Sequence, residues 1–131
     1  MAKHVKLGFC IRYVRDVEQT IAFYERAFGM ERKMIVEGGG YGELKGPPAL
    51  GFASEAQAES LVGAFARSRP DAKPQASELG FIVDDVAAAF ERAVAAGAVA
   101  VTKPVKKPWG QTVAYVRDPD GHLVELCTPM G

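Results

Sequence analysis

The sequence predicts an α+β fold made of two tandem βαβββ modules, whose curled mixed sheets surround a cavity. Strand-like and helix-like segments follow in the same order in both halves of the 131 residues. A motif also repeats at about half the chain length: Tyr24-Glu25-Arg26-Ala27 matches Phe90-Glu91-Arg92-Ala93, 66 positions later (90 − 24). We therefore expect a single domain over 1–131, with a first module at 5–54, a helix and linker at 55–77, and a second module at 78–128.

The first module begins with an apolar, β-branched run at 5–14, which predicts a strand. Asp16 then supplies an N-cap for a helix with apolar residues at helical spacing, and Gly29 ends it. Glycine and proline turns separate three further expected strands, at 33–37, 41–45 and 49–53. An alanine-rich helix at 56–67 and a proline-containing linker at 68–77 follow.

The second module repeats this order. A strand is expected at 78–83, then a helix that begins at Asp84 or Asp85 and stops at Gly97. The next strand, at 98–102, leads into a loop at 103–110 that contains two prolines. Strands at 111–117 and 122–127 flank an Asp-Pro-Asp-Gly turn at 118–121.

Composition excludes several classes of partner. Sixteen basic and sixteen acidic residues give zero formal net charge, which argues against nucleic-acid binding. No apolar run is long enough to span a membrane, so we expect no membrane partner and a cytoplasmic location. Cys10 and Cys127 lie in apolar runs and are expected to be buried free thiols.

The most specific stretch runs from Pro108-Trp109-Gly110-Gln111 into 115–126, where the Asp-Pro-Asp-Gly turn precedes a strand carrying Glu125. With Val14-Arg15-Asp16 at the start of the first helix, this pattern resembles the vicinal oxygen chelate superfamily. That group includes glyoxalase I, bleomycin-resistance proteins and extradiol dioxygenases. The resemblance covers 7–129 and implies paired βαβββ modules and a homodimer. It also implies one divalent metal that acts as a Lewis acid, with a ligand on the first and last strands of each module.

This ligand set is only half present. The first-strand position of module one, five residues before Val14, is Phe9, and its last strand at 49–53 has no ligating residue. In module two the corresponding positions are Glu78 and Glu125. Two carboxylates favour Mg²⁺ or Mn²⁺ completed by water over Zn²⁺ or Ni²⁺.

Each carboxylate has a competing interpretation. Strand alternation places Val124 on the helix-facing side and Glu125 on the concave side, so Glu125 is the candidate catalytic residue. Alternatively, Glu125 is held by Arg117, Arg12 or a backbone amide, and Glu78 is a solvated residue at the start of its strand. His122, at the exit of the turn, is expected to be partly exposed and not catalytic.

The remaining cavity candidates are aromatic or amide side chains. Phe9 and Phe52 are expected as walls, with core packing as the alternative for each. Trp109 lies in a Lys-Pro-Trp-Gly loop at the expected mouth, where an aromatic face can stack on a planar or cationic ligand. Gln111 and Tyr115 complete the predicted ligand-binding set with Glu78.

The function expected from these residues is small-molecule binding of the glyoxalase/bleomycin-resistance type, by sequestration or with a chemistry that the sequence does not specify. The aromatic cavity and the vacancies in module one favour this hypothesis. The alternative is a metal-dependent lyase, isomerase or dioxygenase-like enzyme that uses Glu78 and Glu125. No nucleotide-binding glycine loop or serine-nucleophile motif is present in the sequence.

Overall fold

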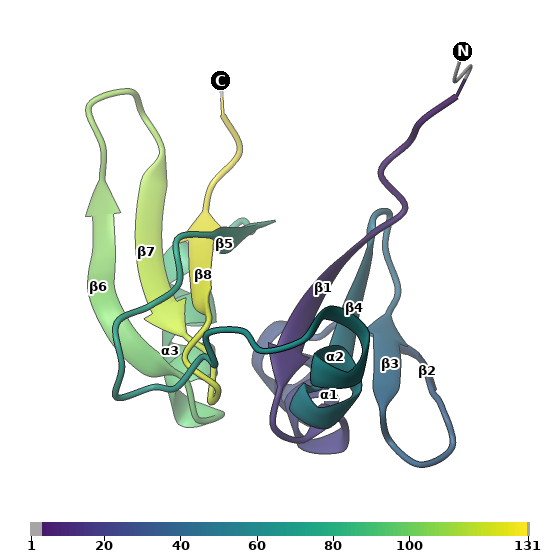
Figure 1. Cartoon of the computed structure of the whole chain (residues 1–131). Coiled ribbons are helices and arrows are strands. Elements are labelled where there is room, and N and C mark those ends of the chain that lie inside the picture. Colours follow the sequence, from purple (N-terminus) through teal and green to yellow (C-terminus); the bar gives the residue numbers. More distant parts are fainter. Residues whose placement is uncertain (1–3, 131) are drawn as a thin grey trace. The chain divides into compact units, whose positions relative to one another are not determined.

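A computed structural model describes residues 4–130 (Figure 1). The chain divides into two compact units at Arg67, except that Arg26–Gly29 groups with the second. The strands form two four-stranded mixed sheets, one from each βαβββ repeat, which confirms the predicted fold class. No helix within residues 4–130 is long and apolar enough to cross a membrane.

The first sheet has the strand order β1-β4-β3-β2, with β1 and β4 parallel and the other neighbours antiparallel. The side chains that face helix α1 form the core of this unit, and Tyr24, Phe52 and Leu44 are fully buried there. The elements are β1 (Phe9–Val14), α1 (Val17–Phe28), β2 (Arg32–Ile35), β3 (Tyr41–Leu44), β4 (Ala49–Ser54) and α2 (Glu55–Val62).

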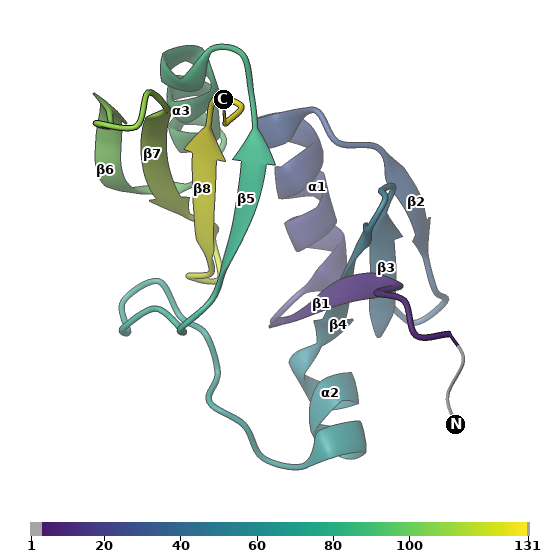
Figure 2. The same cartoon turned by 90° about the horizontal axis from the view of Figure 1, so that it is seen from above.

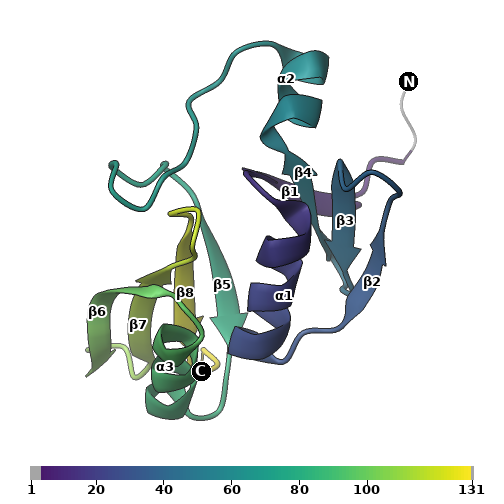
Figure 3. The same cartoon turned by 90° about the horizontal axis from the view of Figure 1, so that it is seen from below.

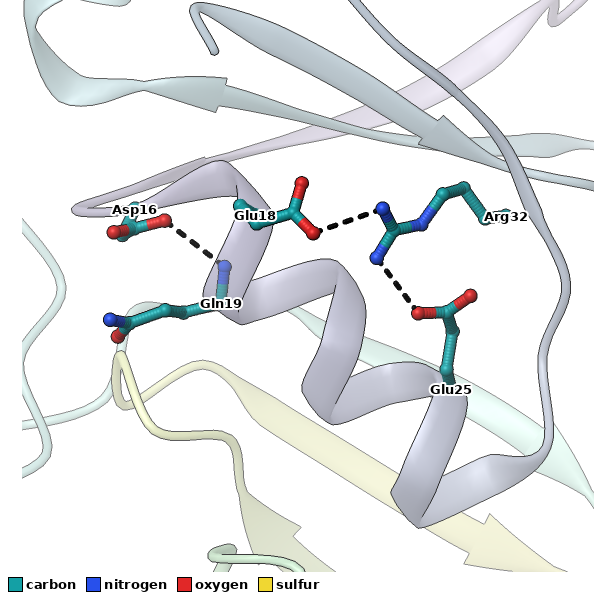
Figure 4. A network of polar contacts seen from close by, with 5 residues as sticks. All are labelled: Asp16, Glu18, Gln19, Glu25 and Arg32. Carbon is teal, nitrogen blue, oxygen red and sulfur yellow. Dashed lines mark hydrogen bonds and ion pairs between the residues drawn. The ribbon is translucent and has the colours of Figure 1, made fainter.

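Helix α1 is fixed at its start and along its exposed side (Figure 4). The Oδ1 atom of Asp16 accepts a hydrogen bond of 3.0 Å from the backbone N–H of Gln19, as expected of an N-cap. The guanidinium of Arg32, at the start of β2, donates to Glu18 at 3.0 Å and to Glu25 at 2.9 Å. This bridge ties the strand to two turns of the helix.

The second sheet has the order β5-β8-β7-β6, again with one parallel pair, β5 and β8 (Figure 2). Helix α3 packs against β6, β7 and β8, and it is capped by Asp85, whose Oδ1 accepts from the N–H of Ala88 at 3.0 Å. Val116, Val124 and Leu126 are fully buried in this unit. Its elements are β5 (Glu78–Ile82), α3 (Val86–Ala95), β6 (Val99–Lys106), β7 (Thr112–Arg117) and β8 (Leu123–Cys127).

Three boundaries differ from the sequence-based expectation by four or more residues. Strand β1 begins at Phe9, and no strand includes Val5. Helix α2 stops at Val62 because Gly63 adopts a φ of +83° there, and an extended segment follows (Figure 3). Strand β6 continues to Lys106, through the expected loop. Pro104 is tolerated because β6 is an edge strand, where one side of the backbone needs no ladder partner.

The Asp-Pro-Asp-Gly turn is held from within. Asp118 is fully buried, and its Oδ1 accepts from the N–H groups of Asp120 and His122, both at 2.9 Å. His122 is 6% exposed, so the expectation of partial exposure was wrong. The reason is that the turn closes over its own buried carboxylate and draws His122 inward with it.

Candidate ligand-binding site

The open face of the second sheet follows from strand register. Residues paired across neighbouring strands point to the same side of a sheet. Gly80 pairs with Glu125, Ile82 pairs with Cys127, and Tyr115 pairs with Glu125, so all five share one face. The alternate residues of β8 are fully buried on the side of α3, which agrees with the helix-facing assignment of Val124 from alternation alone.

A hollow of about 520 Å³ lies in the second unit. This volume is within the range of small-molecule pockets. The side chains that line it are Ile82, Trp109, Gln111, Glu125, Cys127 and Met130. Three of the predicted site residues, Trp109, Gln111 and Glu125, are therefore brought together by the fold.

Tyr115 and Glu125 form a polar pair beside this hollow. The Tyr115 hydroxyl donates to Oε1 of Glu125 at 3.3 Å. Burial, together with the negative charges of Glu125 and Glu78, raises the pKa of Tyr115 to about 12. The pKa of the Cys127 thiol is also raised, first by burial and then by Glu125. Both groups are thus neutral at physiological pH.

Glu78 is exposed at the start of β5. It lies two residues before Gly80, the register partner of Glu125, so both carboxylates belong to the same face of the sheet. Glu78 is not among the residues that line the hollow, but its charge reaches Tyr115. The structure therefore places Glu78 at the edge of the candidate site.

Arg117 does not neutralise Glu125. Its Nε donates to the carbonyl of Gly121 at 2.8 Å, and its two terminal nitrogens donate to the carbonyls of Arg69 at 2.8 Å and Pro70 at 3.2 Å. Arg117 thereby fixes the Asp-Pro-Asp-Gly turn to the chain at 69–70. Within residues 4–130, Glu125 makes no ion pair.

The turn between β6 and β7 presents Trp109. Lys107 donates its backbone N–H to Gln111 O at 2.7 Å, and Gly110 donates to Lys107 O at 2.9 Å. Gly110 has a φ of +103°, which favours glycine at this position. The Trp109 side chain is 63% exposed, yet its indole N–H donates to Oε1 of Gln111 at 2.8 Å. Local turn geometry thus holds an aromatic ring at the rim of the hollow.

The donor set offers little for a resident metal. Among residues 4–130, no group of three or more His, Cys, Asp or Glu side chains lies close enough together to hold a metal ion. Glu78 and Glu125 are the two carboxylates on the relevant face. Such a pair suits only a hard cation that keeps most of its water, and it does not suit Zn²⁺ or Ni²⁺.

The two predicted phenylalanine walls belong to the first unit. Phe52 is fully buried on the helix-facing side, where its ring lies 5.1 Å from that of Tyr24. Core packing, the alternative for this residue, is therefore its role. Phe9 lies on the other face of the sheet, at the edge strand, and is 53% exposed. Neither residue lines the hollow of the second unit.

The first unit has a glycine at the position that corresponds to Glu125. Gly51 pairs with Ile11 and Glu43, as Glu125 pairs with Gly80 and Tyr115. A Cβ atom at Gly51 would overlap the hydroxyl of Tyr41, whose ring fills this space. The Tyr41 hydroxyl donates to Oε2 of Glu43 at 2.7 Å. At Gly51, where a ligating side chain would lie, the space is therefore filled by Tyr41 of β3, which is hydrogen-bonded to Glu43 of the same strand.

Sequence reasoning missed three lining residues. Ile82 and Cys127 share the parity of Glu125 along their strands, so alternation contained the signal for both. Met130 lies beyond the last strand, where no periodicity exists to place it. The two cysteines are both free; Cys127 is buried as expected, whereas Cys10 is exposed on the edge strand β1.

Comparison with known proteins agrees with this architecture. The model of the Glyoxalase/Bleomycin resistance protein/Dioxygenase superfamily matches residues 6–126. The chain is 30% identical over 131 residues to a probable lactoylglutathione lyase of Vibrio cholerae, covering 96% of this chain and 91% of that protein. It is also 30% identical over 116 residues to the Bacillus subtilis protein YwbC, covering 86% of this chain and 89% of the relative.

Solved structures show the same fold. A glyoxalase-related enzyme from Fulvimarina pelagi superposes with a TM-score of 0.80 at 25% identity, covering 95% of this chain and 88% of that one. A glyoxalase/bleomycin resistance protein/dioxygenase family enzyme from Burkholderia phytofirmans superposes with a TM-score of 0.79 at 20% identity, covering 95% and 98%. The predicted family resemblance is therefore confirmed.

Proposed function

Since this chain belongs to the glyoxalase/bleomycin-resistance/dioxygenase superfamily, we propose that it binds and sequesters a small organic cation with a planar apolar body. The ligand would lie in the hollow of the second unit. One observation carries this proposal: Glu125 lines a hollow whose other side chains are uncharged, and it has no cationic partner within residues 4–130. A carboxylate in such surroundings favours a ligand that brings a positive charge.

The walls of the hollow favour an apolar ligand body. Ile82, Trp109 and Met130 are 69%, 63% and 77% exposed, so each retains surface that a ligand can cover. An aromatic face attracts a cation by about 0.5–2 kcal/mol, depending on how fully the pair is desolvated. The indole N–H is already donated to Gln111, so it is the face and edge of Trp109 that a ligand meets.

The charge of Glu125 contributes more to the selectivity for cations than the aromatic face of Trp109 does. At an effective dielectric constant of about 20, two opposite charges about 4 Å apart attract by roughly 4 kcal/mol, and partial exposure lowers this value. An anionic ligand would meet repulsion from the same carboxylate and from Glu78, which already raises the pKa of Tyr115. The hollow should therefore select cations over anions of equal size.

The experiment is a titration of the protein with benzyltrimethylammonium, monitored by the fluorescence of Trp109, the single tryptophan of the chain. Benzyl alcohol and phenylacetate serve as neutral and anionic probes of similar shape. We expect binding of the cation, weaker binding of the alcohol and none of phenylacetate. Glu125→Gln should weaken cation binding at least tenfold, a change of about 1.4 kcal/mol. Equal affinity for all three probes would contradict the proposal.

Glu43→Gln is the matched control. Like Glu125, Glu43 accepts a hydrogen bond from a tyrosine hydroxyl, but it lies in the first unit and is paired with Lys33 at 3.4 Å. The Glu43 variant should bind benzyltrimethylammonium as the unmodified protein does. A similar loss of affinity in both variants would indicate a general effect of removing a carboxylate.

A second hypothesis is a metal-dependent lyase, which the name of the Vibrio cholerae relative supports. In that case Glu78 and Glu125 would hold a hard divalent cation whose remaining ligands are water or substrate oxygens. The test is metal analysis of the purified protein after dialysis against Mg²⁺ or Mn²⁺. One equivalent of metal that is lost in Glu125→Gln would favour the lyase and overturn the sequestration proposal.

A further inference from the structure

Gln111 connects two walls of the hollow that local structure alone would leave independent. Its Oε1 accepts from the indole N–H of Trp109 at 2.8 Å, and its Nε2 donates to the carbonyl of Thr128 at 2.8 Å. Trp109 belongs to the β6–β7 turn, and Thr128 belongs to the segment after β8. One amide group therefore links two parts of the chain that both border the hollow.

The direction of this amide is specified by its neighbours. The indole N–H can only donate, and the Thr128 carbonyl can only accept. If the amide were reversed, its NH₂ group would face the indole N–H and its oxygen would face the carbonyl. Gln111 is about nine-tenths buried, so neither mismatch would be relieved easily by water. The side chain thus has one favourable orientation.

The link to Thr128 also places Met130. The backbone N–H of Thr112 donates to the Thr128 hydroxyl at 3.0 Å, and the Thr128 N–H donates to Thr112 O at 3.1 Å. Together with the Gln111 bond, these contacts hold the C-terminal segment beside the start of β7. Met130 follows two residues later and lines the hollow, although it belongs to no helix or strand.

We infer that Gln111 is a positioning residue that sets the separation and orientation of the Trp109 and Met130 walls, and through them the shape of ligand that the hollow accepts. Gln111 acts through Trp109, whose exposed ring would otherwise populate several rotamers. The effect on a ligand rests on the proposed function, whereas the relay from Trp109 through Gln111 to Thr128 is a property of the protein without ligand.

The test of the relay uses Trp109 as its own reporter. Gln111→Met keeps the length of the side chain but removes both hydrogen bonds. It should lower the fluorescence anisotropy of Trp109 and raise its quenching by acrylamide, with a far-ultraviolet circular dichroism spectrum like that of the unmodified protein. Gln111→Glu keeps an acceptor for the indole but places an oxygen opposite the Thr128 carbonyl, so it should restore the anisotropy only in part. Gln19→Met, an exposed change in α1, is the control and should alter neither signal.

The effect on binding is measured by calorimetry with benzyltrimethylammonium, because one variant lacks tryptophan. Trp109→Phe keeps an aromatic wall and removes the N–H donor. We expect it and Gln111→Met each to weaken binding roughly fivefold, the equivalent of one hydrogen bond. The double variant should lose no more than either single variant, since both break the same relay. A purely structural role for Gln111 would give additive losses.

The outcomes separate the two proposals. If Gln111→Met leaves the anisotropy and quenching of Trp109 unchanged, the positioning role is wrong. If the relay responds as expected but the unmodified protein binds no probe, the proposed function fails and the relay stands. Should Gln111→Met not fold, Trp109→Phe in the exposed turn still decides the matter: binding as tight as that of the unmodified protein would overturn the inference.

Discussion

Replacing Gly121 by alanine should strongly destabilise the second unit. Gly121 has a φ of +95°, and an alanine there costs about 1–2 kcal/mol in backbone strain. A Cβ atom would also lie 2.8 Å from the nitrogen of Pro70 and still closer to the carbonyl of Arg69. These are backbone atoms, so the chain at 69–70 must move away.

That movement breaks contacts of Arg117, whose guanidinium donates to the carbonyls of Arg69 and Pro70. A hydrogen bond to a charged group contributes about 1.5–3 kcal/mol. With the loss of one such bond, Gly121→Ala should reduce the free energy of unfolding by about 2.5–5 kcal/mol. The midpoint of thermal unfolding should fall by roughly 4 °C for each kcal/mol.

Gly110→Ala is the matched control, because Gly110 has a similar φ of +103° but nothing within 4 Å of an added Cβ. It should show the backbone strain alone, about 1–2 kcal/mol. Both variants are compared by urea unfolding followed by circular dichroism, which does not depend on Trp109 beside the control site. Equal destabilisation by the two variants would refute the steric argument for Gly121.

Three further predictions concern the site, the core and the assembly. Glu125→Gln should lower the pKa of Tyr115 from about 12 without returning it to the ordinary value, because burial, the largest cause of the shift, remains; the pKa is read from tyrosinate absorbance during alkaline titration. Folded Tyr115 keeps a proton that the unfolded chain loses above pH 10. Its contribution to the free energy of unfolding is therefore complete below pH 10 and disappears between pH 10 and about 12. A urea midpoint that stays constant across that window would contradict this prediction. Phe52→Ala should lower the free energy of unfolding measured in urea by about 3–5 kcal/mol. Phe9 is half-exposed, so Phe9→Ala should lower it by less than about 1 kcal/mol. Similar losses in the two variants would mean that burial does not distinguish the two rings. We also propose that the protein forms the homodimer that the family resemblance implies, with the edge strand β1 in its interface. Light scattering should show a dimer. Ile11 is an exposed apolar residue of β1, and Ile11→Lys should convert the dimer to a monomer.

Alternation along β8 was sufficient to assign the two faces of the second sheet. The helix-facing side chains of Val124 and Leu126 are fully buried, and Glu125 lies on the opposite face, as the period of two requires. The same rule would have identified Ile82 and Cys127. Period two says nothing about how exposed a face is, however, and so it could not separate Glu78 at the edge from Glu125 beside the hollow.

Phe52 illustrates where the pattern was insufficient. An apolar residue in a strand surrounded by other apolar residues has no alternation to reveal its face, and in β4 four consecutive residues are buried. The face of Phe52 is decided by the register of β4 with β1 and by the position of α1, whose Tyr24 packs against it. These are long-range pairings that no local window contains.

The sequence by itself determined the two βαβββ repeats, the cap at Asp16, a cap at Asp84 or Asp85, and the Asp-Pro-Asp-Gly turn, because periodicity, capping and turn chemistry act over a few neighbouring residues. Only the tertiary structure decided which residues border one hollow, among them Trp109, Gln111, Glu125 and Met130. It also decided that Arg117 donates its hydrogen bonds to backbone carbonyls and that Tyr41 fills the space above Gly51. Those relations join segments far apart in the chain. Their free energy depends on which groups meet after the sheets form, and each residue alone is compatible with several partners.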